Sequence, residues 1–138
     1  MIDLTAEFGT HVAHRLRMEQ VVWLTTISPG GAPQPNPVWF LWEDDSFLIY
    51  TLPDSVKIRN LKQNNHVSLH FNCDEWGGDV VIFTGEAIID QAAPPANQHP
   101  AYLEKYRGGI ADIEMTPESF ATAYSVPVRV KPARMRGF

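Results

Sequence analysis

The chain has 138 residues, a length typical of one domain that can bury a core without a disulfide or metal. Its 11 lysines and arginines and 16 aspartates and glutamates give a net charge of −5, which disfavours nucleic-acid binding. The single cysteine, Cys73, excludes an intrachain disulfide and a multi-cysteine zinc site. Because no apolar run approaches the roughly 18 residues of a membrane span, and the N-terminus does not resemble a signal peptide, we expect one cytoplasmic domain over residues 1–138 that binds no membrane.

The first half of the chain reads as a helix followed by short strands. Apolar residues recur every four positions across residues 3–19 and predict an amphipathic helix with Asp3 or Thr5 as a possible N-cap. Runs rich in β-branched and aromatic residues predict strands at residues 21–27, 38–42 and 47–51, the last two joined as a hairpin.

A proline-rich run lies between the first two predicted strands. In Ala32-Pro33-Gln34-Pro35-Asn36-Pro37, proline alternates with other residues. Since proline has no N–H to donate, this run predicts an edge strand, a bulge or an entry segment.

The second half mixes strands with helices. Asp54 or Ser55 is a suitable cap for a short helix that ends near Gln63. Strands are predicted at residues 66–71, 79–90 and 124–131, the second with a bulge or bend at Gly85, and helices near residues 97–106 and from Pro117 onward. We therefore expect a mainly β (α+β) fold, an antiparallel barrel of about six strands, closed or partly open, with peripheral helices.

Common catalytic and nucleotide-binding signatures are absent from the sequence. It contains no G-x-G-x-x-G fingerprint, no phosphate-binding P-loop and no G-x-S-x-G elbow. His11 and His14 are spaced as a helical pair but read better as a solvated face than as metal ligands, so no metal is expected. Cys73 has no evident base beside it and is interpreted as a buried apolar residue. No catalytic side chain is assigned.

Five segments, taken in order, carry a resemblance to a known family: residues 23–27, 30–40, 49–51, 57–61 and 65–69. They resemble the pyridoxamine 5′-phosphate oxidase-like split β-barrels, which bind FMN or a deazaflavin, and residues 81–87 are similar to the family's next strand. The run Pro-Gln-Pro-Asn-Pro-Val-Trp-Phe is similar to the subgroup that uses the deazaflavin coenzyme F-420. The resemblance implies a six-stranded antiparallel split barrel, a homodimer with the cofactor at the subunit interface, and hydride transfer between the cofactor and a small organic acceptor.

Two cations are candidates for holding the cofactor phosphate. Lys57 and Arg59 lie in the first turns of the helix predicted after Asp54, where the N–H groups and the helix dipole favour an anion. Residues two positions apart on a helix point to nearly opposite sides, so only one can face a given phosphate. The resemblance selects Lys57 and leaves Arg59 for a partner or for the polyglutamate-like tail of a deazaflavin. The alternative is that both are solvated surface charges.

The remaining candidates surround the cofactor ring and its phosphate-bearing chain. The resemblance implies that the strand backbone at Pro37, Val38 and Trp39 runs beside the ring, with successive side chains on opposite faces. Hydroxyl groups next to the predicted helix are placed to meet the phosphate or ribityl chain, namely those of Tyr50, Thr51 and Ser55. Each aromatic residue among these candidates could equally be a core residue.

Trp76 lies in a glycine-containing loop and is expected either to cover the cofactor of the partner subunit or to anchor the loop. Oxidation of pyridoxamine phosphate is less favoured, because Arg134-Met135-Arg136 lacks the family's Arg-x-His pair. An FMN-dependent oxidase or reductase, a non-catalytic cofactor-binding module and a haem-degrading barrel remain alternatives, although no histidine is convincingly placed as an axial haem ligand. Nothing in the sequence selects the acceptor.

Overall fold

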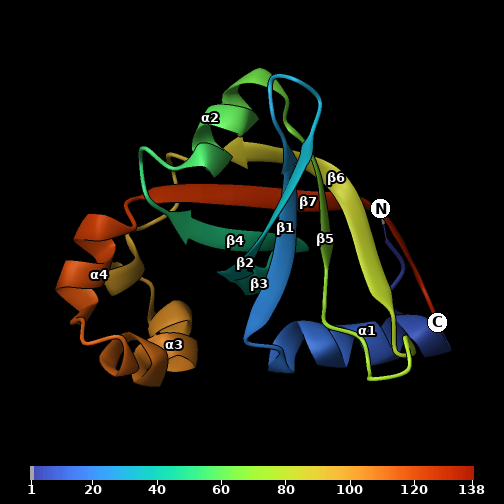
Figure 1. Ribbon diagram of the computed structural model, residues 1–138. Coiled ribbons are helices and arrows are strands. Elements are labelled where there is room, and N and C mark those ends of the chain that lie inside the picture. Colours follow the sequence, from blue (N-terminus) through green and yellow to red (C-terminus); the bar gives the residue numbers. More distant parts are fainter. Residues whose placement is uncertain (1) are drawn as a thin grey trace.

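Residues 2–138 of the computed structural model form one curled antiparallel sheet surrounded by helices (Figure 1). In chain order the elements are α1 (Glu7–Met18), β1 (Val21–Ile27), β2 (Pro33–Trp39), β3 (Leu41–Glu43), β4 (Ser46–Thr51), α2 (Val56–Gln63), β5 (His66–His70), β6 (Val81–Ile89), the 3-10 helix η1 (Ala96–Gln98), α3 (Pro100–Asp112), α4 (Pro117–Ala123) and β7 (Val126–Gly137). The seven strands are ordered β2-β1-β5-β6-β7-β4-β3. Within residues 2–138, no helix combines the length and apolar character needed to cross a bilayer.

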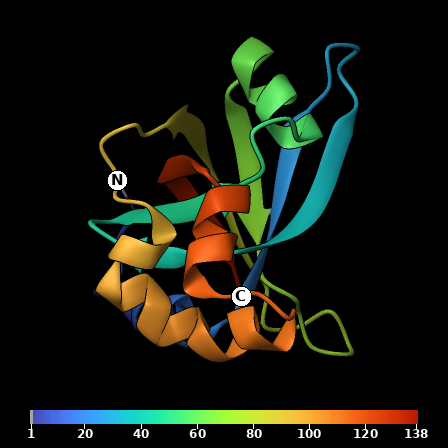
Figure 2. The same cartoon turned by 90° about the vertical axis from the view of Figure 1, so that its left-hand side faces the viewer.

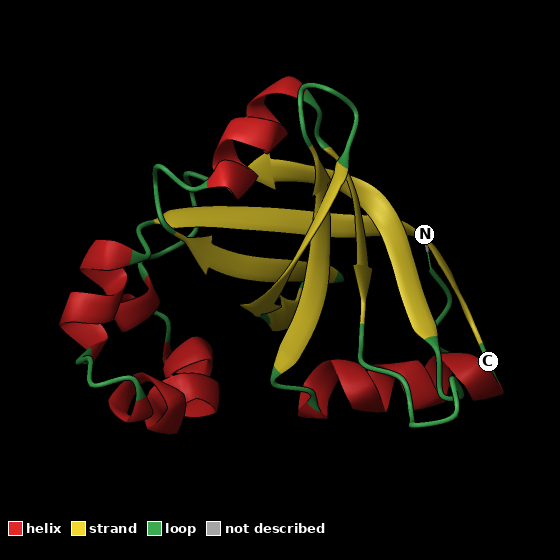
Figure 3. Ribbon diagram, viewed as in Figure 1, coloured by secondary structure: helices red, strands yellow, loops and turns green. Residues whose placement is uncertain are grey.

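The predicted mainly β fold of the α+β class is confirmed, with seven strands in place of six (Figure 3). The additional strand arises because residues 38–42, predicted as one strand, are divided between β2 and β3 at Phe40. The predicted hairpin consists of β3 and β4, paired from Leu41–Leu48 to Glu43–Ser46.

The proline-rich run forms the edge strand β2, which was one of the three predicted possibilities. β2 pairs with β1 along its whole length, from Val21–Trp39 to Ile27–Pro33, and it ends the sheet on its other side. A strand with one unpaired side can hold prolines, because their missing N–H groups fall where no ladder bond is needed.

The helices lie around the sheet. α1 lies across one end of it and α2 lies at the other end (Figure 1). α3 and α4 lie together beside β4 and the start of β7, as the turned view shows (Figure 2). The corner between α2, β4 and the α3–α4 pair is where the predicted site residues meet.

Two apolar clusters lie on opposite sides of β4. The first fills the curl of the sheet and includes Phe40, Phe47, Ile49, Leu69, Phe83, Val128 and Val130. The second lies under α3 and α4 and consists of Leu48, Tyr50, Ala96, Tyr102, Tyr106, Ile110 and Phe120. Every residue of β4 is buried, because alternate side chains point into the two clusters.

α1 begins four residues later than the predicted start at Asp3, so the predicted N-terminal boundary of this helix is wrong. The helix starts at Glu7 after Ala6, which provides no side-chain cap. Asp3 instead accepts hydrogen bonds from the backbone N–H and the hydroxyl of Thr5, so neither predicted cap reaches the helix. The apolar face is as predicted, with Val12 and Leu16 fully buried.

Two local signals at the centre of the chain are confirmed. The side chain of Ser55 accepts a hydrogen bond from the N–H of Ile58 and so caps α2. The pairing of β6 with β7 shifts register between Thr84 and Gly85. A Cβ at Gly85 would lie 2.9 Å from the carbonyl oxygen of Lys131, so the bulge needs glycine.

Phe40 separates β2 from β3, and α3 supplies the hydrogen bonds that its peptide groups would otherwise lack. The N–H of Phe40 donates to the hydroxyl of Tyr106 at 2.8 Å, and that hydroxyl donates to the carbonyl of Gln20 at 2.6 Å. The carbonyl of Phe40 accepts from the Nζ of Lys105 at 2.7 Å. Burial lowers the pKa of Lys105 to about 8. These contacts dock α3 onto the break between the strands.

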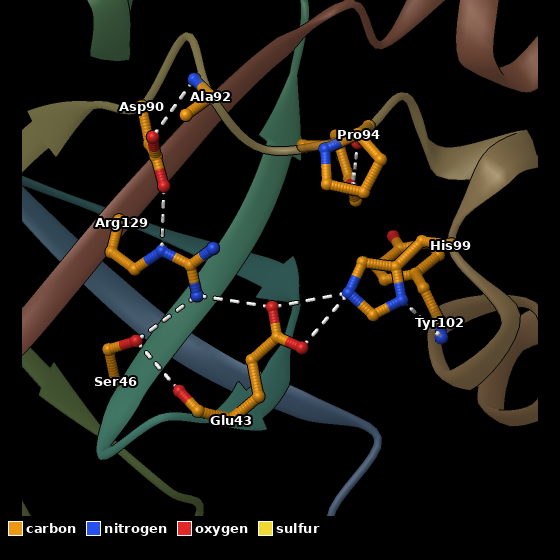
Figure 4. A network of polar contacts seen from close by, with 9 residues as sticks. Glu43, Ser46, Asp90, Ala92, Pro94, His99, Tyr102 and Arg129 are labelled. Atoms are coloured by element: carbon orange, nitrogen blue, oxygen red, sulfur yellow. Dashed lines mark hydrogen bonds and ion pairs between the residues drawn. The ribbon is translucent and has the colours of Figure 1, made fainter.

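A buried polar network provides a second attachment of α3 (Figure 4). The carboxylate of Glu43 accepts from the Nε2 of His99 at 3.0 Å and from the Nη1 of Arg129 at 3.2 Å. Arg129 also donates to Asp90 at 3.0 Å and to the hydroxyl of Ser46. The network therefore joins β3, β4 and β7 to the segment that leads into α3.

His99 is also the N-cap of α3. Its Nδ1 accepts from the backbone N–H of Tyr102 at 3.4 Å, so the Nε2 carries the ring hydrogen and donates it to Glu43. One imidazole thus links the first turn of α3 to the sheet, and this link fixes where Tyr102 lies.

We expect Tyr106→Phe to lower the free energy of unfolding by about 1–3 kcal/mol, because it leaves the buried N–H of Phe40 without a partner and removes the hydrogen bond to the carbonyl of Gln20. Urea denaturation measures the change. Tyr124→Phe is the matched control, since the Tyr124 hydroxyl makes no hydrogen bond within residues 2–138, and it should change stability by less than about 0.5 kcal/mol. Equal losses in the two variants would contradict the assigned role of Tyr106.

We expect Glu43→Gln to lower the free energy of unfolding by about 1–3 kcal/mol, because hydrogen bonds to a charged group are lost around Arg129 and His99. Denaturation in urea at neutral pH provides the measurement. The control is Glu104→Gln, an exposed carboxylate that makes no ion pair within the described chain. A Glu43 variant as stable as this control would show that the network contributes little to docking α3.

Candidate functional site

A pocket of about 280 Å³ lies where the ends of β2 and β4 meet the first turn of α2 and the α3–α4 pair. It is lined by Pro37, Val38, Trp39, Tyr50, Thr51, Leu52, Lys57, Tyr102, Ile113, Phe120 and Tyr124. Larger surface hollows, of about 540, 480, 340 and 300 Å³, lie elsewhere on residues 2–138. The one of about 300 Å³ holds Trp42 beside Arg17 and Lys105, and the other three are lined by no Phe, Tyr or Trp side chain. The pocket of about 280 Å³ places one cation, Lys57, against five aromatic side chains.

Most of the residues named from the sequence are brought together in this pocket. Six of the nine line it: Pro37, Val38, Trp39, Tyr50, Thr51 and Lys57. The predicted alternation along the strand is present, since Val38 packs against the first apolar cluster and Trp39 against the second. The other three, Ser55, Arg59 and Trp76, lie outside the lining.

Lys57 provides the positive charge of the pocket. It is the second residue of α2, it is half-buried, and it takes part in none of the ion pairs found among residues 2–138. Burial lowers the pKa of Lys57, because the ammonium has lost water without gaining a negative partner. The N-terminal N–H groups of α2 add a further preference for an anion at this position.

Ser55 and Arg59 have structural contacts of their own. The hydroxyl of Ser55 caps α2 and lies 3.4 Å from the hydroxyl of Thr51, so it links the helix to the end of β4. The guanidinium of Arg59 is exposed and donates to the carbonyl of Asp54 at 2.8 Å. Lys57 and Arg59 therefore differ as predicted for residues two positions apart, with only Lys57 facing the pocket.

Trp76 lies far from this pocket in its own chain. It belongs to the loop between β5 and β6, which lies at the α1 end of the sheet, opposite α2 (Figure 1). Its side chain is 88% exposed, so it does not anchor the loop in the core. Cys73 in the same loop is also exposed, which corrects the expectation of a buried apolar cysteine. The carboxylate of Asp74 accepts hydrogen bonds from the N–H groups of Trp76 and Gly78, and these bonds close the tip of the loop.

Aromatic rings stacked on one another form the wall of the pocket opposite α2. Trp39 stacks on Phe120 with ring centroids 5.6 Å apart, and Phe120 stacks on Tyr124 at 4.6 Å. Tyr106, which lies outside the lining, supports the wall by stacking on Trp39 at 4.7 Å. Gly109 allows this packing, since a Cβ there would lie 3.1 Å from the Trp39 ring. The wall is flat and apolar, as a planar ligand requires.

Sequence reasoning missed the part of the lining that comes from beyond residue 100. Tyr102, Ile113, Phe120 and Tyr124 belong to the α3–α4 region. The sequence predicted helices near residues 97–106 and from Pro117 onward, and it placed Tyr124 at the start of the last strand, whereas Tyr124 is the C-cap of α4. One signal was available, because Tyr102 and Tyr106 are spaced by four and share a helix face. That spacing marks an apolar face but does not say which strands the face covers.

The hydroxyl groups of Tyr50 and Thr51, at the end of β4, differ in whether they are free to bind a ligand. The hydroxyl of Tyr50 donates to the carbonyl of Pro94 at 2.6 Å, and burial raises the pKa of Tyr50 to about 12, so it stays protonated at neutral pH. The hydroxyl of Thr51 has only that of Ser55 nearby, at 3.4 Å. Thr51 therefore has free hydrogen-bonding capacity next to Lys57.

Comparisons with known proteins agree with this architecture. A solved structure described as F-420 reductase aligns with a TM-score of 0.69 and 20% identity, over 89% of this chain and 94% of that one. A conserved hypothetical protein from Mycobacterium tuberculosis gives 0.73 and 24%, over 96% and 83%. The heme storage protein HutZ from Vibrio cholerae gives 0.65 and 11%, over 96% and 95%. At these identities the likeness shows the fold alone.

The family assignment comes from the sequence itself. No curated protein matches the chain. Residues 8–136, however, match the sequence model of the family described as pyridoxamine 5′-phosphate oxidase, which spans α1, all seven strands and the α3–α4 pair. This chain therefore belongs to the pyridoxamine 5′-phosphate oxidase family.

Proposed function

We propose that this protein is an oxidoreductase that binds a deazaflavin of the coenzyme F-420 type in the pocket between α2 and the α3–α4 pair and reduces a small organic acceptor. The observation that carries the proposal is Lys57, a half-buried cation without an ion-pair partner among residues 2–138, at the mouth of an aromatic-walled pocket. A phosphorylated flavin-type cofactor requires this combination of an anion site and a flat apolar slot.

The residues present fit such a cofactor at both ends of the pocket. The lowered pKa of Lys57 reflects a charge that lacks a counterion, and a bound phosphate would supply one. The N–H groups of the first turn of α2 and the hydroxyl of Thr51 lie beside it as further donors. The stacked rings of Trp39 and Phe120 offer a surface for a planar ring.

When bound, the reduced cofactor supplies the hydride that the acceptor takes up. The side chains of this chain hold and orient the ring, and the apolar wall excludes water from the transfer path. Within residues 2–138 the lining contains no carboxylate, histidine or cysteine, so apart from Lys57, which the proposal assigns to the phosphate, it presents neither a base-activated nucleophile nor a general base. Hydride transfer from a cofactor requires neither of these groups.

FMN is the alternative cofactor, because it also joins a phosphate to a flat ring. Two observations favour the deazaflavin: the proline-rich run that ends in Val38-Trp39-Phe40, and the presence of an F-420 reductase among proteins of the same fold. A heme storage protein shares the fold as well, so a non-catalytic binding role is the second candidate. We further propose a homodimer with the cofactor at its interface, in which the exposed Trp76 reaches the cofactor of the partner subunit.

Titration of the purified protein with oxidised coenzyme F-420 and, separately, with FMN tests the proposal through the fluorescence of each ring. Reoxidation of the reduced cofactor in the presence of quinone, tetrapyrrole and aromatic acceptors then separates an enzyme from a binding module. Light scattering with and without cofactor measures the oligomeric state. A protein that binds neither cofactor would overturn the proposal.

We expect Lys57→Ala to weaken cofactor binding by about 10- to 150-fold, which corresponds to the roughly 1.5–3 kcal/mol of a hydrogen bond to a charged group. Fluorescence titration gives the dissociation constant. Lys62→Ala is the matched control, because it removes the same charge from the exposed far end of α2 and should leave binding nearly unchanged. If both variants bind as the wild type does, Lys57 is not the phosphate-binding residue.

Arg59→Ala should distinguish the two cofactors. Since Arg59 is exposed and lies two residues after Lys57 on α2, its proposed contact with the anionic tail of F-420 is expected to contribute about 0.2–1 kcal/mol, or up to roughly fivefold in affinity. FMN has no such tail, so its affinity should not change. The effect should shrink in high salt. Equal effects on both cofactors would argue against a tail contact.

A further inference from the structure

One buried hydroxyl, on a residue that lines the pocket, lacks a hydrogen-bond partner among residues 2–138. The side chain of Tyr102 is fully buried and belongs to the pocket lining. Its Oη is the one buried side-chain nitrogen or oxygen without a partner among residues 2–138. Buried polar groups in folded proteins are nearly always hydrogen-bonded, so an unpartnered hydroxyl at a pocket needs an explanation.

Among residues 2–138 no acceptor lies within hydrogen-bond reach of the Tyr102 hydroxyl, and aromatic neighbours hold its ring in place. Its ring packs against Tyr50 at 4.8 Å between centroids, against Tyr106 at 4.9 Å and against Phe120 at 6.1 Å. Its backbone N–H is fixed by the His99 cap at the start of α3. The two neighbouring tyrosines already donate their hydroxyl hydrogens elsewhere, to the carbonyls of Pro94 and Gln20.

The Tyr102 hydroxyl stays neutral and has a hydrogen to donate. Burial raises the pKa of Tyr102 far above its ordinary value, so the hydroxyl keeps its hydrogen at any physiological pH. A ligand that takes this hydrogen must therefore place an acceptor atom in a mainly aromatic environment. Lys57 and Tyr102 both line the pocket but come from different helices, α2 and α3, which lie apart in the fold, α2 at the top and α3 at the lower left of Figure 1.

We propose that Tyr102 is a cofactor-binding residue whose hydroxyl donates a hydrogen bond to a carbonyl oxygen of the bound deazaflavin or flavin ring. This inference rests on the proposed function and adds a second recognition point to it. Lys57 binds the anionic group, and Tyr102 binds the ring. Because one contact recognises an anion and the other a carbonyl oxygen, together they select a ligand that carries both a phosphate and a carbonyl-bearing ring.

The test compares Tyr102→Phe with Tyr106→Phe, which removes a hydroxyl from the same helix one turn away. The Tyr106 hydroxyl is bonded inside the protein and lies outside the pocket lining. Each variant and the wild type are titrated with oxidised coenzyme F-420, or with FMN if the wild type binds only FMN, and the melting temperature is measured with and without cofactor.

For Tyr102→Phe we expect at least a fivefold weaker affinity, a melting temperature of the free protein equal to or above that of the wild type, and a smaller stabilisation by the cofactor. Removing an unpartnered hydroxyl while keeping the ring should not destabilise the free protein. Tyr106→Phe should show the opposite pattern, with a lower melting temperature and an affinity within twofold of the wild type.

The outcomes separate this inference from the proposed function. If the wild type binds neither cofactor, the proposed function falls and the inference falls with it. If the wild type binds a cofactor and Tyr102→Phe binds it equally well, only the role of Tyr102 is overturned. Equal losses of affinity in both variants would also overturn it, because the cause would then be a general disturbance of α3.

Discussion

The architecture of this protein depends on the peptide groups of Phe40. At this residue the sheet ladder is interrupted, and side chains of α3 replace the missing strand partners through the Tyr106 hydroxyl and the Lys105 ammonium. The break allows Phe40 to fill the curl of the sheet while Trp39 faces the α3–α4 pair. Without α3 these backbone groups would be buried and unbonded, so the helix, the division of β2 from β3 and the aromatic wall form together.

Two partly buried cations, Arg129 and Lys57, differ in whether they have hydrogen-bonding and ion-pair partners. Arg129 is surrounded by acceptors, since Glu43, Asp90 and Ser46 all bond its guanidinium. Lys57 has no ion-pair partner within the described chain and retains a lowered pKa. The paired guanidinium of Arg129 holds the junction of the strands with α3 together, whereas the ammonium of Lys57, which has no counterion in the described part of the chain, is available to an anion. This contrast supports the proposed anion site at α2 and a structural role for the Glu43 network.

The candidate site combines one nearly contiguous segment of the chain with helices that lie much later in the sequence. The strand ends of β2 and β4 and the first turn of α2 form a nearly contiguous unit of residues 37–57, which brings backbone, hydroxyls and a cation to one corner. The α3–α4 pair adds the apolar wall and the unpartnered Tyr102 hydroxyl. Because solved structures of the same fold have different described roles, the fold alone does not specify a function, and the proposed specificity rests on these side chains.

The sequence by itself determined the elements whose signals are local: β1, the capped start of α2 at Ser55, the bulge at Gly85 and the edge position of the prolines. It also placed Lys57 and Thr51 next to each other, because they lie at the two ends of one short connection. Only the tertiary structure decided where α1 starts, where the second strand breaks and which aromatic residues close the pocket. Those features depend on contacts between residues far apart in sequence, such as Phe40 with Tyr106, and no local propensity encodes such contacts.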